Sequence, residues 1–135
     1  MNYLLDTNTV SELTKENPDP KVVNWIRTNH RNSFLSAVTI GEIVKGIELL
    51  PDGKKRRRLA RELRFLQEDY HDRVLAYDEI TAVEWGRLYA AARKQHRLLP
   101  LEDSLIEAIA LSYELTVATH NVNDFFRVRT IDPWI

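Results

Sequence analysis

Four acidic side chains stand where metal-dependent chemistry would need them. They are Asp6, Glu42, Asp103 and Asp124. Clustered carboxylates repel one another, at about 4 Å and an effective dielectric constant near 20, by roughly 4 kcal/mol per pair, so such a cluster normally requires a cation. The chain has no cysteine and no paired histidine motif, and oxygen ligands alone suit Mg²⁺ or Mn²⁺ better than Zn²⁺. Water held by such an ion can attack a phosphodiester.

Each acid also has a simpler explanation as part of a helix cap. Asp6 and Asp103 can each cap the helix that begins beside them, a contact worth roughly 1 kcal/mol. The other acids stand three residues after a hydroxyl or amide side chain, which is the spacing of a capping box or a looser version of it. The pairs with this spacing are Thr39 and Glu42, Asn121 and Asp124, Thr9 and Glu12, Thr81 and Glu84, and Ser104 and Glu107. Taken singly, each acid is explained at least as well by a cap as by a metal site.

Apolar runs and helical patterns alternate along the chain, and they define the elements that must position these acids. Strands are expected at 3–6, 33–39, 73–78, 115–121 and 128–132, and helices at 7–15, 20–28, 40–50, 54–70, 79–97 and 103–113. This alternation favours an α/β fold with a mainly parallel sheet, in which a ligand site lies off the carboxyl ends of the strands. The fold would bring the acid-bearing ends to one edge, which favours a shared site over separate caps.

Two of the expected helices have apolar faces that predict how they pack. The helix at 54–70 carries the stripe of Leu59, Leu63, Leu66 and Tyr70, with the spacing of one helix face. The helix at 79–97 is expected to turn Val83, Leu88 and Ala91 inward.

Length and composition narrow the class of protein. The 135 residues suit one domain spanning 1–135. The lack of cysteine excludes disulfides and indicates a reducing cytoplasm. No run of about 18 apolar residues is present, so no transmembrane helix is expected. The net charge of −1 argues against a protein that coats nucleic acid through bulk charge.

Four sequence blocks carry a resemblance to a known family. They are LLDTN at 4–8, TIGEIVKGIELL at 39–50, LEDSLIEAIA at 101–110 and VATHNVNDF at 117–125, with a closing IDPW at 131–134. In this order and spacing they resemble PIN-domain proteins, and more narrowly the VapC- or FitB-like toxins of type II toxin–antitoxin pairs. The resemblance covers the whole chain. It implies a three-layer α/β/α sandwich and a Mg²⁺- or Mn²⁺-dependent endoribonuclease that hydrolyses RNA phosphodiester bonds through a metal-activated water.

The resemblance also implies roles for individual residues. The acidic pocket would consist of Asp6, Glu42, Asp103 and Asp124. Asp6 and Asp103 would be the firmest metal ligands, with the other two acids completing the pocket directly or through water. Three polar residues would support the acids: Thr7, Asn8 and Thr119. Partners of a bound carboxylate orient it in this way.

Three positions depart from the family pattern. Glu102, Asp103 and Ser104 stand where Pro-Asp-Ala is usual. Glu107, one helical turn after Asp103 and on the same face, replaces a small residue. It is either a fifth pocket acid or the partner of Ser104 in a capping box, and the cap is favoured. His120 stands where Arg or Lys is usual, and it either touches substrate or is a solvated turn residue, the second being favoured.

The resemblance further implies partners. A cognate VapB- or FitA-like antitoxin would wrap the toxin with its C-terminal segment and present a basic side chain to the acids. Promoter DNA would be bound only through the antitoxin, and the toxin would form a homodimer in a bacterial or archaeal cytoplasm. Arg57, Arg61 and Arg64, which share one helix face in and after the KKRRR run, either contact RNA or antitoxin or form a solvated face.

Two other function classes remain open from the sequence. A phosphotransfer domain of the phosphatase type requires Asp-x-Asp near the first strand, and this chain has Asp6, Thr7 and Asn8. A receiver domain requires an acid pair near the first strand and a lysine after the last, and neither is present. The third class is a non-catalytic interaction module whose acids serve only as helix caps.

Overall fold

Five short parallel strands form the centre of the structure, a computed structural model that describes all 135 residues. The strands are β1 (Tyr3–Leu5), β2 (Ser33–Ser36), β3 (Val74–Leu75), β4 (Thr116–Ala118) and β5 (Thr130–Ile131). Their order in the sheet is β3-β2-β1-β4-β5, and every neighbouring pair is parallel. The predicted parallel α/β architecture is therefore confirmed, although the strands are shorter than the sequence indicated.

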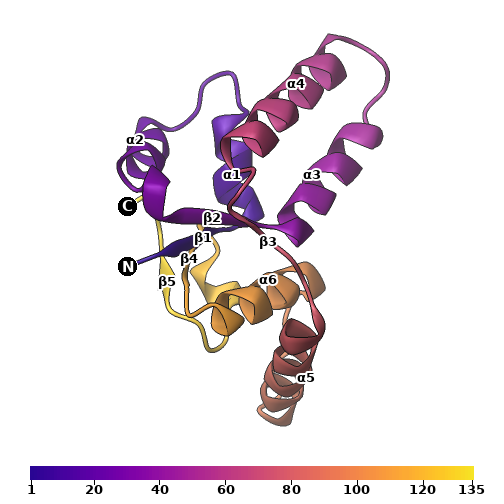
Figure 1. Ribbon diagram of the computed structural model, residues 1–135. Coiled ribbons are helices and arrows are strands. Elements are labelled where there is room, and N and C mark those ends of the chain that lie inside the picture. Colours follow the sequence, from indigo (N-terminus) through magenta and orange to yellow (C-terminus); the bar gives the residue numbers. More distant parts are fainter.

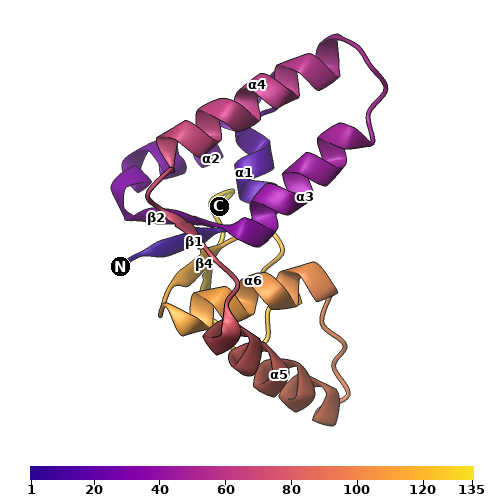
Figure 2. The ribbon, with the colours of Figure 1, turned by 45° about the vertical axis from the view of Figure 1, so that its right-hand side comes forward.

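Helices cover both faces of this sheet (Figures 1 and 2). They are α1 (Thr7–Leu13), α2 (Pro20–Thr28), α3 (Ala37–Glu48), α4 (Lys54–Asp69), α5 (Glu79–Lys94) and α6 (Leu101–Ser112), with short 3-10 turns at His30–Asn32 and Val122–Asp124. Helices α1 to α4 lie on one side, and α5 and α6 lie on the other. This is the predicted three-layer sandwich. None of the helices has the length and apolar character that crossing a lipid bilayer requires.

The two faces of the sheet have separate cores because successive strand residues point in opposite directions. Leu4 packs against Ile106 of α6. Leu5, the next residue, packs against Val10 of α1 and Leu35 of β2. Both leucines are completely buried. Strand β1 is thus fixed from both sides at the point where it ends in Asp6.

The helix faces match the sequence prediction only in part. Val83 was expected to point inward but is 48% exposed, and Ala91 is only partly buried; the buried side chains of α5 in this region are Leu88 and Ala92. The outer helix α5 packs chiefly against α6, so it needs only a narrow apolar face. In α4 the predicted stripe does face inward, but no residue of the helix is fully buried. Tyr70, which directly follows the helix, is fully buried.

The order of the strands explains where a site can form. Strand β1 lies between β2 and β4 in the sheet. Strand β2 is the next strand along the chain, whereas the chain reaches β4 only after β2 and four more helices. The connections therefore leave β1 and β4 in opposite directions, which opens a crevice beyond their carboxyl ends. Asp6 directly follows β1, and Thr119 directly follows β4.

Candidate functional site

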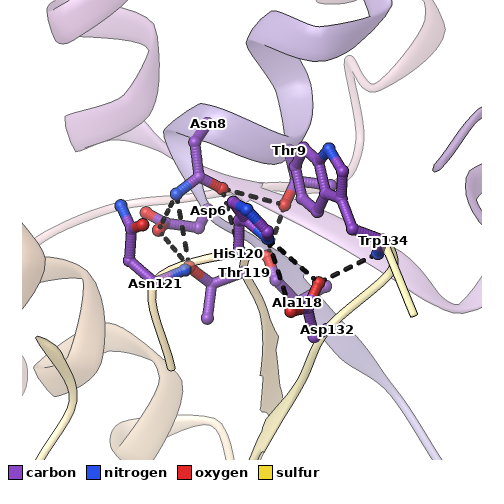
Figure 3. A network of polar contacts seen from close by, with 9 residues as sticks. All are labelled: Asp6, Asn8, Thr9, Ala118, Thr119, His120, Asn121, Asp132 and Trp134. Atoms are coloured by element: carbon purple, nitrogen blue, oxygen red, sulfur yellow. Dashed lines mark hydrogen bonds and ion pairs between the residues drawn. The ribbon is translucent and has the colours of Figure 1, made fainter. Parts of the chain in front are cut away.

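Asp6 is a buried carboxylate held by three donors. Its side chain lies at the end of β1 and only 2% of the residue is exposed. Oδ1 accepts from the backbone N–H of Thr7 at 2.8 Å. Oδ2 accepts from Thr119 Oγ1 at 2.7 Å and from Asn8 Nδ2 at 3.2 Å (Figure 3). Asp6 therefore caps α1, as one reading of the sequence predicted, and still presents a fixed carboxylate at the crevice.

Burial dominates the electrostatics of Asp6. Burial raises the pKa of the carboxyl. The hydrogen bonds from Thr119 and Thr7 lower this pKa, and the negative charges of Glu42 and Asp124 raise it. The latter two acids come from other segments of the chain. Their effect shows that the fold brings their charges close to Asp6.

Asn8 connects the two strand ends (Figure 3). Besides donating to Asp6, its Nδ2 approaches Thr119 Oγ1 at 3.4 Å, and its Oδ1 accepts from Thr9 Oγ1 at 3.2 Å and from the backbone N–H of His120 at 3.4 Å. Thr9 also donates to the carbonyl of Ala118 at 2.8 Å. Thr9 thus joins α1 to β4, and the prediction that it caps α1 is wrong.

Glu42 is bound to the start of α1. Its Oε1 accepts from Thr7 Oγ1 at 2.7 Å, and the same hydroxyl lies 3.0 Å from Thr39 Oγ1. The cap of α3 is Ser36, whose Oγ accepts from the N–H of Thr39 at 3.0 Å. The predicted capping box of Thr39 and Glu42 is therefore wrong, and Glu42 is free of any capping role.

Asp103 has the most strongly perturbed carboxyl of the group. It stands in the first turn of α6, whose N-cap position is Pro100, so the prediction that Asp103 caps this helix is wrong. Its pKa is raised to about 7, chiefly by burial. Smaller contributions come, in decreasing order, from the charges of Asp6 and Asp124, a side-chain contact with Asp124 and the charge of Glu42.

Asp124 ends the 3-10 turn Val122–Asp124. The N-cap position of that turn, Asn121, makes no side-chain cap bond, so the predicted looser capping arrangement is wrong as well. Asp124 instead lies close enough to Asp103 and Asp6 to raise the pKa of both.

The four acids thus form one negatively charged cluster without a basic partner. None of them makes a salt bridge. As the side chains lie, no three acidic or histidine side chains converge closely enough to coordinate one ion. Mg²⁺ is usually bound by one or two carboxylates together with water and substrate phosphates, so the donor set still fits this ion. The metal-binding role of these residues stays a prediction.

Comparison with known proteins decides the family. The family model of the PIN domain matches residues 3–130. The chain belongs to the PIN domain family. Toxin FitB of Neisseria gonorrhoeae is 33% identical over 97% of each chain. VapC ribonuclease Y4jK of Sinorhizobium fredii is 31% identical, over 97% of this chain and 96% of the relative. The structure of FitAB bound to an IR36 DNA fragment superposes with a TM-score of 0.91 at 31% identity, covering 98% of this chain and 96% of that one. The predicted resemblance to VapC- and FitB-like toxins is confirmed.

Glu107 has neither of the roles that the sequence suggested. It is completely buried in α6 of this PIN domain, and its carboxylate accepts from the backbone N–H groups of Phe126, Arg127 and Val128. It is therefore neither a fifth pocket acid nor the cap partner of Ser104, whose hydroxyl bonds the carbonyl of Leu101 and the indole N–H of Trp85. No local pattern reveals this arrangement, because its amide partners lie 19 to 21 residues further along the chain.

Two further capping boxes are also wrong. Helix α5 is capped by Asp78, which accepts from the N–H of Thr81, so Glu84 has no such role. Glu12 is 5% exposed and accepts from the N–H of Asp19 at 2.8 Å. Its pKa is lowered by hydrogen bonding to Lys15 and then to this N–H.

His120 lies at the rim of the site without entering it. Its ring packs at a tilt of 35° against that of Trp134, with 4.6 Å between the ring centroids, and its Nδ1 lies 3.4 Å from Asp132. The side chain is 56% exposed, in line with the favoured prediction of a solvated turn residue.

The basic run of this PIN domain divides into two sets. Arg56 pairs with Glu48 at 2.6 Å, and Arg58 donates to the carbonyl of Thr14, so both fasten α4 to its neighbours. The predicted contact residues Arg57, Arg61 and Arg64 are exposed and make no salt bridge. They remain available to a partner.

A groove of about 950 Å³ lies beside the acids, between α1, α3 and α4. Thr7 and Glu42 line it near the sheet. Its apolar lining consists of Ile43, Ile47, Leu50, Leu59, Leu63 and Leu66. Its basic lining consists of Lys15, Lys54, Lys55 and Arg58. Helix α3 runs away from the sheet, and a loop joins its far end to the start of α4, which runs back towards the sheet (Figure 1). The groove between them therefore extends from an acidic end at Glu42 to a basic end at Lys54.

Proposed function

We propose that this PIN domain is the toxin of a toxin–antitoxin pair and a Mg²⁺- or Mn²⁺-dependent endoribonuclease. The observation that carries this proposal is the unpaired acid cluster, in which Asp6 is buried and the other three acids are partly buried, and in which the pKa of Asp103 is raised to about 7. Buried carboxylates that raise one another's pKa are unfavourable unless a cation or a proton compensates them. Such perturbed groups in a crevice are typical of functional sites. The VapC relatives, which are named ribonucleases, support RNA as the substrate.

Asp6 and Asp103 would hold the ion most firmly, with Glu42 and Asp124 completing the site directly or through water. A bound ion would supply a water of lowered pKa as the nucleophile for hydrolysis of the RNA phosphodiester. Thr119 and Asn8 hold Asp6 in one orientation by their hydrogen bonds. Thr7 does the same for Glu42. Groups fixed in this way need no reorganisation when substrate arrives.

The antitoxin would occupy the groove between α1, α3 and α4. An amphipathic segment would lay its apolar side chains along the leucines and isoleucines, place acidic side chains at Lys54 and Lys55, and bring a basic side chain to Glu42. A cation at that end would compensate the carboxylates and exclude the metal. The FitAB neighbour, solved with a DNA fragment, supports an antitoxin that brings the pair to promoter DNA.

The capping interpretation, on which the non-catalytic alternative rested, holds only for Asp6. Glu42, Asp103 and Asp124 make no capping bond. No contact in the structure favours the phosphotransfer alternative, and β1 is followed by Asp6, Thr7 and Asn8 without a second acid.

The proposal is tested with purified protein and labelled RNA. Cleavage is expected with Mg²⁺ or Mn²⁺, and EDTA or Asp6→Asn should abolish it. Asp78→Asn is the matched control, because it removes one carboxylate that caps α5 and asparagine caps equally well. If Asp6→Asn cuts RNA as fast as Asp78→Asn does, the assignment is wrong.

A further inference from the structure

The buried carboxylate of Glu107 accepts hydrogen bonds from the backbone shortly after Asp124. Oε1 accepts from the N–H of Phe126 at 3.0 Å. Oε2 accepts from the N–H groups of Phe126 at 3.1 Å, Arg127 at 2.6 Å and Val128 at 3.0 Å. No lysine, arginine or histidine pairs with Glu107. Its negative charge is therefore compensated by three consecutive peptide dipoles, which bends the chain around one fixed point.

Arg97 holds the same segment through the opposite kind of group. It follows α5, and its guanidinium donates to the carbonyl oxygens of Asn123 and of Phe125, the latter at 2.9 Å. The guanidinium also lies over the ring of Phe126, 5.7 Å from its centroid. The Arg97 guanidinium thus binds the backbone carbonyls on both sides of Asp124, while the Glu107 carboxylate binds the backbone N–H groups of residues 126–128.

We propose that Glu107 and Arg97 form a clamp that positions Asp124 in the acid cluster. Helix α6 then carries Asp103 directly and, one turn later, sets the place of Asp124 through Glu107. The two acids are held by the same helix although they are 21 positions apart in the sequence. This inference rests on the proposed function for its consequence in catalysis, but the clamp itself concerns the structure of residues 122–128.

A purely structural role would make a different prediction. Phe125 is buried in the core beneath α6, 5% exposed, and it could hold the segment to the fold without Glu107. In that case losing Glu107 would cost stability and leave Asp124 in place. If the clamp positions Asp124, a variant that breaks the clamp must weaken metal binding more than a variant that loses the same stability at another place in the fold.

The experiment compares Glu107→Gln with Glu12→Gln. In the first variant the amide group can accept fewer of the three N–H bonds and brings its own donors towards them. Glu12 is a matched control, because it is another buried carboxylate that accepts from a backbone N–H, that of Asp19, and it lies in α1, on the other side of the sheet from α6. Three measurements are made: hydrogen exchange of the amides of residues 122–128 in the metal-free protein, the dissociation constant for Mn²⁺ alone, and kcat and KM for RNA cleavage.

We expect Glu107→Gln to speed exchange in residues 122–128 and to weaken Mn²⁺ binding about 10- to 100-fold, as loss of an orienting partner does. RNA cleavage should lose kcat with little change in KM. Glu12→Gln should leave all three unchanged. Unaltered exchange at 122–128, or equal losses in both variants at matched thermal stability, would overturn the proposal.

A second variant covers the case in which Glu107→Gln does not fold. Arg97→Gln removes the cation from a partly exposed position and should shift exchange at 122–125 in the same direction, with Mn²⁺ binding weakened several-fold; unchanged exchange there would count against the clamp. If the unmodified protein cuts no RNA, the proposed function fails. The exchange data on the metal-free protein still decide whether the clamp exists.

Discussion

Helices α4 and α6 are both rich in apolar side chains, yet they are used in different ways. In α6 the side chains of Ile106, Ala108, Ile109 and Ala110 are all completely buried. In α4 none is, and its leucines line an open groove. We infer that α6 is a fixed support for the proposed metal site, carrying Asp103 and Glu107, whereas α4 offers the surface on which the proposed antitoxin would pack.

The largest effect should come from opening the core under α6. Ile106→Ala removes a completely buried side chain that packs on Leu4 and should lower the free energy of unfolding by about 2–5 kcal/mol. Urea denaturation of the metal-free protein measures this. If Ile106→Ala lowered the free energy of unfolding by less than Leu63→Ala in α4 does, α6 would not be the more firmly packed of the two helices.

Removing the acid that α6 carries should break activity rather than the fold. Asp103→Asn is expected to reduce RNA cleavage by at least about a hundredfold, since even partners that merely orient metal ligands contribute 10- to 100-fold. Single-turnover cleavage at saturating Mn²⁺ measures the loss. Circular dichroism should show an intact fold; cleavage within threefold of the unmodified protein would exclude Asp103 from the reaction.

The same acid should make stability depend on pH. In the folded protein the pKa of Asp103 is about 7, above its ordinary value of 3.8, so the fold retains a proton that the unfolded chain releases. Stability of the metal-free protein should therefore fall as the pH rises from about 4 to about 7 and level off above that. Asp6, whose pKa is also raised, acts in the same direction.

We expect a loss on the order of 1 kcal/mol between about pH 5 and pH 8, below the full value of the shift because water reaches part of the Asp103 side chain. Chemical denaturation at the two pH values measures it. Glu12 and Asp78, whose pKa values are lowered, do not contribute in this range. Asp103→Asn should flatten the curve and stabilise the metal-free protein at pH 8, and saturating Mg²⁺ should do the same for the unmodified protein.

The smallest effect on the isolated protein should come from the open face of α4. Leu63→Ala should cost less than about 1 kcal/mol, since the side chain is only partly buried, and should leave RNA cleavage unchanged. It should weaken binding of the antitoxin, measured by calorimetry with the co-expressed partner. Phe65→Ala is the control, because this residue lies on the same helix, 64% exposed, but does not line the groove.

The sequence predicted the order of elements well because that order depends on local patterns. Pro20, preceded by the cap Asp19, sets the start of α2 where the sequence placed it. The four acids were also found, since each stands beside a recognisable strand end or helix start. Their metal-binding roles remain predictions.

The capping predictions failed for a physical reason. Three-residue spacing between a hydroxyl and an acid is common in helices, while the partners that these acids choose are distant. Glu42 bonds Thr7, 35 residues earlier, and Glu107 bonds amides of the loop before β5. Val83 was misplaced because a helix on the outside of a second layer buries only one narrow face. Such contacts depend on tertiary packing, which local spacing does not encode.

The hydrogen bond between Thr119 and Asp6 joins residues 113 positions apart, and β1 pairs with β4 across the same interval. During synthesis on the ribosome, the first strand is made long before the strand that completes its pairing. Closing so long a loop is also slow for a refolding chain. The acid cluster therefore cannot assemble until β4 and Asp124 have been synthesised, and a nascent chain that stops short of them does not contain it.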